Sequence, residues 1–153
     1  MNIVQPLPSI TPDVLSRFAA IVGSKYAVTD AHDMAPYLIE DRGLFQGRSP
    51  MVLRPGSTAE VAAICRLATE TKTALVPQGG NTGLVGGQTP QHGEIIVSMR
   101  RLDKIRAVDT QSNTMTVEAG GILANAQVAA SNVDRLFPLS LGAEGSCTIG
   151  ERP

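Results

Sequence analysis

A stretch of glycines between residues 77 and 87 is the feature of this sequence best suited to chemistry. Five glycines fall in it; it directly follows the apolar segment 74–76 and reads Pro77-Gln78-Gly79-Gly80-Asn81-Thr82-Gly83-Leu84-Val85-Gly86-Gly87. Without a Cβ, a glycine can take φ > 0 and approach a ligand closely, and consecutive N–H groups can converge on an anion. The stretch therefore predicts an anion-binding loop, with phosphate as the natural ligand.

Two residues among these glycines favour a ligand loop over a plain connection. A run of glycines by itself is usually a flexible link or a tight bend. Asn81 and Thr82 add side-chain donors, which a link does not need. We therefore favour the ligand loop.

The glycine spacing fits neither of two common phosphate-binding motifs. The nucleoside triphosphate motif G-x-x-x-x-G-K-[ST] requires a lysine, and none follows these glycines. The dinucleotide motif G-x-G-x-x-G differs from the spacing Gly80-x-x-Gly83-x-x-Gly86, and no helical pattern follows it. Metal-assisted phosphoryl transfer and a nicotinamide site are both disfavoured.

A second stretch of small and polar residues, 142–150, is another candidate ligand loop. It reads Gly-Ala-Glu-Gly-Ser-Cys-Thr-Ile-Gly and, taken alone, is weak evidence. Neither Cys65 nor Cys147 lies in a metal-binding or redox spacing. We expect no metal site.

A predicted strand, helix and strand lead into the glycine stretch. Residues 51–53 read as a buried strand, and the capping box Ser57-Thr58-Ala59-Glu60 opens a helix that runs to about Lys72. Residues 74–76 form the second strand. Such a unit normally pairs its two strands in parallel.

The remaining patterns place this unit in a mixed fold. They predict an amphipathic helix from Thr11 to Gly23, a short helix or irregular link over 33–40, a strand over 94–98, a hairpin of strands 105–109 and 114–119, a helix over 122–133, and an ordered loop over 136–150. The expected class is α+β: a small parallel βαβ subdomain followed by a partly antiparallel second subdomain.

Length and composition describe one globular domain, or part of one, that does not bind nucleic acid. The chain has 153 residues, 42% of them hydrophobic and 18% charged. A net charge of -1 and 3% aromatic residues exclude the basic, stacking surfaces of nucleic-acid binders. The N-terminus lacks a basic region followed by an apolar stretch, so we expect a cytoplasmic location.

The two candidate loops together resemble the flavin-binding domain of the p-cresol methylhydroxylase and vanillyl-alcohol oxidase superfamily. The resemblance is greatest to the FAD-linked D-2-hydroxy acid dehydrogenases, which include D-2-hydroxyglutarate and D-lactate dehydrogenases. It is carried by residues 77–87 and by Pro138-Leu139-Ser140-Leu141-Gly142-Ala143-Glu144-Gly145-Ser146-Cys147-Thr148-Ile149-Gly150. Val52-Leu53-Arg54-Pro55 and Glu60-Val61 support it.

The resemblance implies FAD as the cofactor and assigns residues to it. The first loop would cradle the pyrophosphate through Gln78, Gly79, Gly80, Asn81, Thr82 and Gly83. The second would run along the ribityl chain and flavin through Pro138, Gly142, Ser146, Thr148, Ile149 and Gly150. Some relatives attach the flavin to a histidine of the first loop. Asn81-Thr82 stand there in this sequence, so we expect non-covalent FAD.

The implied activity is oxidation of a D-2-hydroxy acid, of the D-lactate or D-2-hydroxyglutarate type, to the 2-oxo acid by hydride transfer to FAD. A quinone or an electron-transfer flavoprotein would accept the electrons. One alternative is another oxidoreductase of the superfamily, such as a sugar or aldonolactone oxidase or a UDP-N-acetyl-enolpyruvylglucosamine reductase. Another is a non-enzymatic truncated product that self-associates through exposed apolar surface.

The sequence departs from the family pattern at its end. Family members continue after Gly150 with a second glycine and an asparagine, whereas this chain reads Gly150-Glu151-Arg152-Pro153. We therefore expect residues 1–153 to be the N-terminal part of one incomplete flavin domain, with its core at 11–150. No catalytic residue is assigned, and we expect the fragment alone to be inactive.

Overall fold

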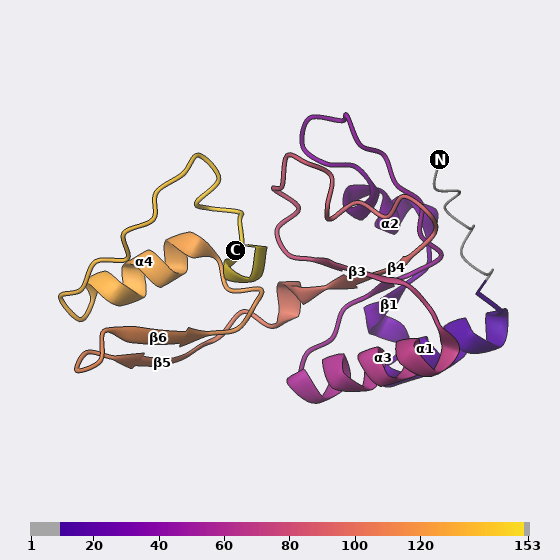
Figure 1. Cartoon of the computed structure of the whole chain (residues 1–153), viewed down its shortest axis with the longest axis horizontal. Helices are drawn as coiled ribbons and strands as arrows, with labels where there is room; N and C mark the ends of the chain where they lie inside the picture. Colours follow the sequence, from indigo (N-terminus) through magenta and orange to yellow (C-terminus); the bar gives the residue numbers. More distant parts are fainter. Residues whose placement is uncertain (1–9, 152–153) are drawn as a thin grey trace, which may run out of the picture.

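The computed structural model describes residues 10–151, which form two parts (Figure 1). The first part is a four-stranded sheet with helices, and the second is a two-stranded hairpin with one helix. The expected α+β class, with a parallel unit first and an antiparallel one second, is confirmed. Residues 1–9, on which the expected location rested, and Arg152-Pro153 lie outside the described residues.

The sheet brings the ends of two parallel strands together beside the glycine stretch. Its strands are β1 (Ala27–Val28), β2 (Val52–Leu53), β3 (Leu75–Gln78) and β4 (Ile95–Ser98), in the order β1-β2-β4-β3. β4 is parallel to β2 and to β3, and it separates the two strands that the strand-helix-strand pattern suggested as neighbours. Because Gln78 pairs with Ser98, the segments that follow β3 and β4 start side by side.

Helices cover both faces of this sheet. They are α1 (Pro12–Val22), α2 (Ala31–Leu38) and α3 (Thr58–Thr71). The segment 33–40, for which the sequence allowed a short helix or an irregular link, is helical up to Leu38. Successive side chains of a strand point to opposite faces. Leu53 and Ile95 therefore pack with α1 and α3, whereas Val52 and Ile96 pack with α2 on the other face (Figure 1).

The helix ends in the first part follow the predicted capping residues. Thr11 caps the start of α1, and Gly23, with φ of 81°, is the capping residue that follows its last residue, Val22. Ser57 Oγ accepts the Glu60 N–H at 3.1 Å. The Glu60 carboxylate reaches one residue further back than a standard capping box and accepts the Gly56 N–H at 2.8 Å.

The second part consists of the predicted hairpin and helix. Its elements are β5 (Ile105–Asp109), β6 (Thr114–Val117) and α4 (Leu123–Ser131), so β6 ends before the predicted limit at residue 119. α4 buries Leu123, Ala126 and Ala130. Among the described helices, none is long and apolar enough to cross a membrane.

The last described residues return to the junction between the two parts (Figure 1). Thr148 forms an isolated bridge with Ile122, just before α4. The N–H groups of Ile149 and Gly150 donate to the carbonyls of Gly121 and Ala119, each at 2.8 Å. The second candidate loop is thereby fixed beside the glycine stretch.

Candidate functional site

The glycine loop, residues 78–87, owes its shape to one asparagine and one glycine. Asn81 has φ of 63° and Gly86 has φ of 75°, whereas Gly79, Gly80 and Gly83 have no left-handed backbone. The expectation that glycines supply the positive φ therefore holds here only for Gly86. Asparagine is one of the few other residues that tolerates this conformation.

Gly79 and Gly80 are where the two predicted loops touch. A Cβ on Gly79 would lie 2.0 Å from Thr148 Oγ1, and one on Gly80 would lie 2.0 Å from the Ser146 carbonyl oxygen. Atoms cannot approach so closely, so a side chain at either position would push the loops apart. The two stretches identified separately in the sequence form one site.

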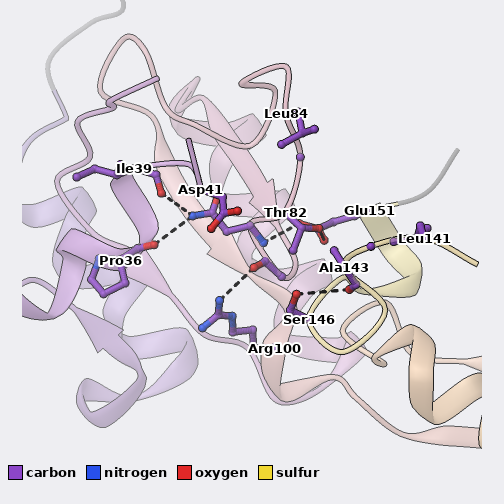
Figure 2. Close-up of a pocket in the computed structure, with 14 residues that line it drawn as sticks. Pro36, Ile39, Asp41, Thr82, Leu84, Arg100, Leu141, Ala143, Ser146 and Glu151 are labelled. Atoms are coloured by element: carbon purple, nitrogen blue, oxygen red, sulfur yellow. Dashed lines mark hydrogen bonds between the residues drawn. The ribbon is translucent and has the colours of Figure 1, made fainter. Parts of the chain in front are cut away.

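A cavity of about 820 Å³ opens where the loops meet (Figure 2). The segment around the end of α2, the glycine loop, Arg100 and the second loop (residues 138–150) contribute its walls together with Glu151. Of the predicted FAD contacts, six line this cavity: Gly80, Asn81, Thr82, Gly83, Gly142 and Ser146.

A smaller cavity of about 280 Å³ shares part of this lining. Four other predicted contacts line it: Gln78, Gly79, Thr148 and Gly150. The Thr148 hydroxyl is buried and has no hydrogen-bond partner among the described residues. Because buried hydroxyls are normally bonded, an unpartnered one beside a cavity fits a missing ligand.

Two predicted contacts are not brought to these cavities. Pro138 lines a separate cavity of about 320 Å³ beside the hairpin and α4. Ile149 lines none of the three cavities. The structure therefore assembles ten of the twelve residues assigned to FAD.

The side chains of Asn81 and Gln78 anchor the glycine loop instead of reaching into the cavity. Asn81 Nδ2 donates to the carbonyls of Pro36 at 3.1 Å and Ile39 at 2.8 Å, at the end of α2 where helix carbonyls lack partners (Figure 2). Gln78 Nε2 donates to the Tyr37 carbonyl at 2.9 Å. The side-chain donor that we expected Asn81 to offer a ligand is used by α2.

The carboxylate of Glu151 is hydrogen-bonded to the glycine loop (Figure 2). It accepts the Asn81 N–H at 2.8 Å, the Thr82 hydroxyl at 3.3 Å and the Thr148 N–H at 3.3 Å. A carboxylate and a phosphate are both oxyanions that accept such donors. The loop thus has the donors that an anion-binding site requires.

Arg100 adds a positive charge to the cavity wall and was missed by the sequence analysis. Its guanidinium lies within 3.4 Å of the Gly79 carbonyl and 3.3 Å of the Gly80 carbonyl, and 5.7 Å from the centre of the Tyr37 ring. It lies in the short 3-10 helix Met99–Arg101 that follows β4, and the parallel pairing of β4 with β3 brings it to the glycine loop. The sequence pattern that could have indicated Arg100 is its position just after the predicted strand 94–98.

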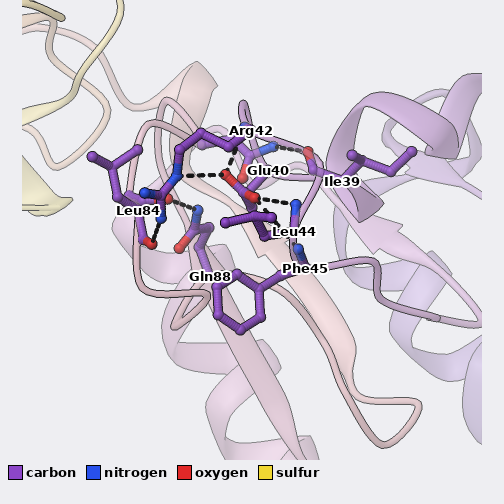
Figure 3. A network of polar contacts seen from close by, with 9 residues as sticks. Ile39, Glu40, Arg42, Leu44, Phe45, Leu84 and Gln88 are labelled. Carbon is purple, nitrogen blue, oxygen red and sulfur yellow. Dashed lines mark hydrogen bonds and ion pairs between the residues drawn. The ribbon is translucent and has the colours of Figure 1, made fainter.

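Glu40 ties the segment after α2 to the glycine loop (Figure 3). Its buried carboxylate accepts the N–H groups of Arg42 at 2.7 Å, Leu44 at 2.6 Å and Phe45 at 3.3 Å. The Arg42 N–H above all lowers the pKa of Glu40, with burial acting in the opposite direction. The Arg42 guanidinium in turn donates to the Leu84 carbonyl.

The residues present fit the FAD that the sequence predicts. Gly79 and Gly80 have no Cβ where the two loops meet, so their backbone is open to a ligand. The Asn81 N–H already binds the Glu151 carboxylate, and the Arg100 guanidinium lies nearby. The larger cavity lies within the range of roughly 300–1,000 Å³ typical of cofactor sites. Within the described part of the chain, no group of His, Cys, Asp or Glu side chains could hold a metal ion.

Comparisons with known proteins match this site. The family described as "FAD binding domain" matches residues 49–150, which include both loops. A protein of Oryza sativa subsp. indica named "Probable D-2-hydroxyglutarate dehydrogenase, mitochondrial" is 40% identical over 92% of this chain and 25% of its own length. The mitochondrial D-2-hydroxyglutarate dehydrogenase of Danio rerio is 38% identical over 95% of this chain and 27% of its own length. The chain thus spans about a quarter of these relatives.

Solved structures share the fold at low sequence identity. An alkyldihydroxyacetonephosphate synthase matches 97% of this chain and 29% of its own with a TM-score of 0.82 and 19% identity. The substrate complex of p-cresol methylhydroxylase matches 90% of this chain and 28% of its own with a TM-score of 0.73 and 18% identity. These likenesses confirm the expected fold of the p-cresol methylhydroxylase type.

The expected cytoplasmic location is wrong on this evidence. The relatives from Oryza sativa and Danio rerio are both named as mitochondrial proteins. Our expectation rested on the absence of a secretory pattern near the N-terminus. That absence says nothing about a mitochondrial protein, because transit peptides have a different composition.

Proposed function

This chain belongs to the FAD binding domain family, and from that premise we propose that it binds FAD non-covalently in the cavity between its two loops. The pyrophosphate would lie against the backbone of residues 78–83, with the flavin side along the second loop. The observation that carries the proposal is that the Asn81 N–H and the Thr82 hydroxyl already bind an oxyanion, the carboxylate of Glu151. All twelve assigned contacts stay predictions; ten of them line the two cavities of the site, whereas Pro138 and Ile149 line neither.

Non-covalent binding is supported by the side chains around the two cavities of the site. No histidine or cysteine is among the described residues that line them. The two histidines of the sequence, His32 and His92, lie in other segments. Among the residues that line these two cavities, there is thus no histidine of the kind to which some relatives attach the flavin.

We propose further that the chain is part of an enzyme that oxidises a D-2-hydroxy acid, of the D-2-hydroxyglutarate or D-lactate type, to the 2-oxo acid. The names of the relatives support this substrate class: those from Oryza sativa and Danio rerio are named as D-2-hydroxyglutarate dehydrogenases, and one from Schizosaccharomyces pombe is named as a putative D-lactate dehydrogenase. When bound, FAD supplies the acceptor for the hydride that leaves C2 of the substrate. Electrons would pass on to a quinone or an electron-transfer flavoprotein.

In this enzyme the present residues would hold and orient the cofactor. The glycine loop positions the phosphates, and Arg100 fixes the carbonyls of Gly79 and Gly80 so that their peptide planes keep one orientation. We assign no catalytic acid or base to this chain. Residues 11–150 are proposed as the core of the N-terminal part of one flavin domain, in line with relatives about four times as long.

Titration of FAD into the 153-residue chain tests cofactor binding through two glycine variants. Gly80→Ala brings its Cβ to 2.0 Å from the Ser146 carbonyl oxygen and has to separate the loops. The Cβ of Gly145→Ala meets nothing within 4 Å, and Gly145 lines neither cavity of the site. We expect flavin fluorescence to show saturable binding to the wild type and to Gly145→Ala. The Kd of Gly80→Ala should be about tenfold higher or more, given an overpacking cost of about 1–3 kcal/mol.

Two results would contradict the proposed cofactor site. One is an equal Kd for the wild type and both variants, which would place FAD elsewhere on the chain. The other is no binding to a wild-type chain whose circular dichroism shows the folded state.

A further inference from the structure

The Glu151 carboxylate uses hydrogen-bond donors that the phosphates of FAD would need. It is bonded to the Asn81 N–H, the Thr82 hydroxyl and the Thr148 N–H. It also lines both the larger and the smaller cavity of the site. Within the described part of the chain, these three groups are its partners and it forms no ion pair.

The glutamate side chain also fills space next to the glycine backbone. A Cβ on Gly79 would lie 2.8 Å from Glu151 Cγ. The side chain comes from the short 3-10 helix Ile149–Glu151 at the end of the second loop. Figure 2 shows Glu151 directed at Thr82 across the line where the two loops meet.

A carboxylate and a pyrophosphate cannot share this position. An N–H group makes one strong hydrogen bond at a time, and two anions in contact repel each other strongly in a site partly shielded from water. The tether to the chain gives the carboxylate a high effective concentration at the loop. Any phosphate ligand therefore has to displace it.

We propose that Glu151 is an intramolecular competitor of FAD, whose carboxylate has to leave the Asn81 N–H before the pyrophosphate binds. This inference rests on the proposed function, because it concerns the same cavity and cofactor. The measured affinity for FAD is then the intrinsic affinity reduced by the fraction of chains in which the carboxylate has left the loop. Glu151 thereby sets the affinity for the cofactor.

Competition at this position would affect only ligands that carry phosphate groups. Ligands that carry the phosphates, namely FAD, ADP and inorganic pyrophosphate, have to displace the carboxylate. Riboflavin has no phosphate, so its binding is independent of Glu151. A general change in the fold or in the net charge would not distinguish these ligands.

The test compares Glu151→Gln with a charge-matched control. Glu70→Gln also removes one negative charge, but its side chain is 63% exposed and pairs with Arg17 on the face of α1 and α3. We expect Glu151→Gln to lower the Kd for FAD and ADP about tenfold, as the loss of a competing charge-assisted hydrogen bond predicts. The Kd for riboflavin, and the Kd of Glu70→Gln for FAD, should stay within about twofold of the wild type.

Each outcome decides between the inference and the proposed function. If the wild type and Glu151→Gln bind FAD with equal Kd, Glu151 does not compete with FAD, but the proposed cofactor site is retained. Folded chains that both fail to bind FAD contradict both proposals. If Glu151→Gln does not fold, Glu151→Asp replaces it, because its carboxylate is one methylene shorter and should compete less well, again with a lower Kd for FAD.

Discussion

Single polar side chains shape this site by bonding backbone groups of distant segments. Gln78 and Asn81 bind carbonyls at the end of α2, and Glu40 gathers the N–H groups of the loop that follows. The glycine loop could be located from residue types and order alone. The roles of Arg100 and Glu151 could not, because their partners in the glycine loop lie at least 20 residues away in the sequence. The partners of Glu40 are its near neighbours, but they lie in an irregular segment that no helix or strand pattern describes.

Replacing Glu40 by glutamine should destabilise the chain more at neutral than at acidic pH. The backbone N–H groups, that of Arg42 first, hold the pKa of the folded carboxyl below its ordinary value of 4.5. A group with a lowered folded pKa stabilises the fold above its unfolded pKa, and this contribution is lost as the pH falls through the folded value. Melting temperatures of the wild type and Glu40→Gln should therefore differ at pH 7 and converge as the pH falls through the lowered pKa of the folded state.

Glu70→Gln serves as the control for that comparison, since it removes an exposed carboxylate far from the loop. It should leave the melting temperature nearly unchanged at pH 7. If the melting temperature of Glu40→Gln stays as far below that of the wild type throughout an acid titration as it is at pH 7, the charge of Glu40 has no part in stability.

Thr148→Val should change stability and cofactor affinity in opposite directions. The Thr148 hydroxyl is buried without a described partner, so valine of similar shape should keep or raise the free energy of unfolding by up to about 1 kcal/mol. If the hydroxyl bonds FAD, the Kd should rise severalfold. Thr89→Val is the matched control, because Thr89 Oγ1 is also buried and unpartnered but lines none of the site cavities. An unchanged Kd for Thr148→Val would remove this residue from the site.

At the scale of elements, the sequence predicted what local patterns encode. α1 and α3 carry capping residues, and β5 and β6 flank a polar turn, so their limits are close to those expected. The position of β4 between β2 and β3 depends on pairing between distant segments. α2 was ambiguous because Pro36 lies inside it, where proline normally interrupts a helix.

Asn81→Gly tests the link between α2 and the glycine loop. Glycine takes the φ of 63° without strain, so the variant removes the two side-chain hydrogen bonds while it keeps the backbone shape. We expect urea unfolding to show a loss of about 1–2 kcal/mol, and the Kd for FAD to rise because the loop loses its anchor.

Asn113→Gly provides the comparison, since Asn113 also has a positive φ, of 53°, but lies in the hairpin turn. It should leave the Kd for FAD unchanged. If Asn81→Gly binds FAD as well as Asn113→Gly does, the link to α2 does not position the loop.

At the scale of the whole molecule, the two parts meet at the loops that form the site (Figure 1). The α+β class and the FAD cofactor were predicted from the sequence, but the approach of the parts was not. It depends on Gly79 and Gly80 packing against the second loop, which is visible only in three dimensions. Self-association stays a prediction; exposed apolar side chains such as Val85 and Leu136 are where it would be sought.

The central claim is that phosphate groups bind the backbone N–H groups of the glycine loop while the flavin lies along the second loop. Amide-resolved NMR of the isotope-labelled chain during an FAD titration tests it most directly. We expect the largest shift changes at residues 79–83 and 146–150. ADP should reproduce those at 79–83 and at Thr148, whose N–H loses the Glu151 carboxylate, but not the others in 146–150. Binding of FAD with unchanged amides at 79–83, or with shifts gathered around Pro138 and the hairpin, would contradict the claim.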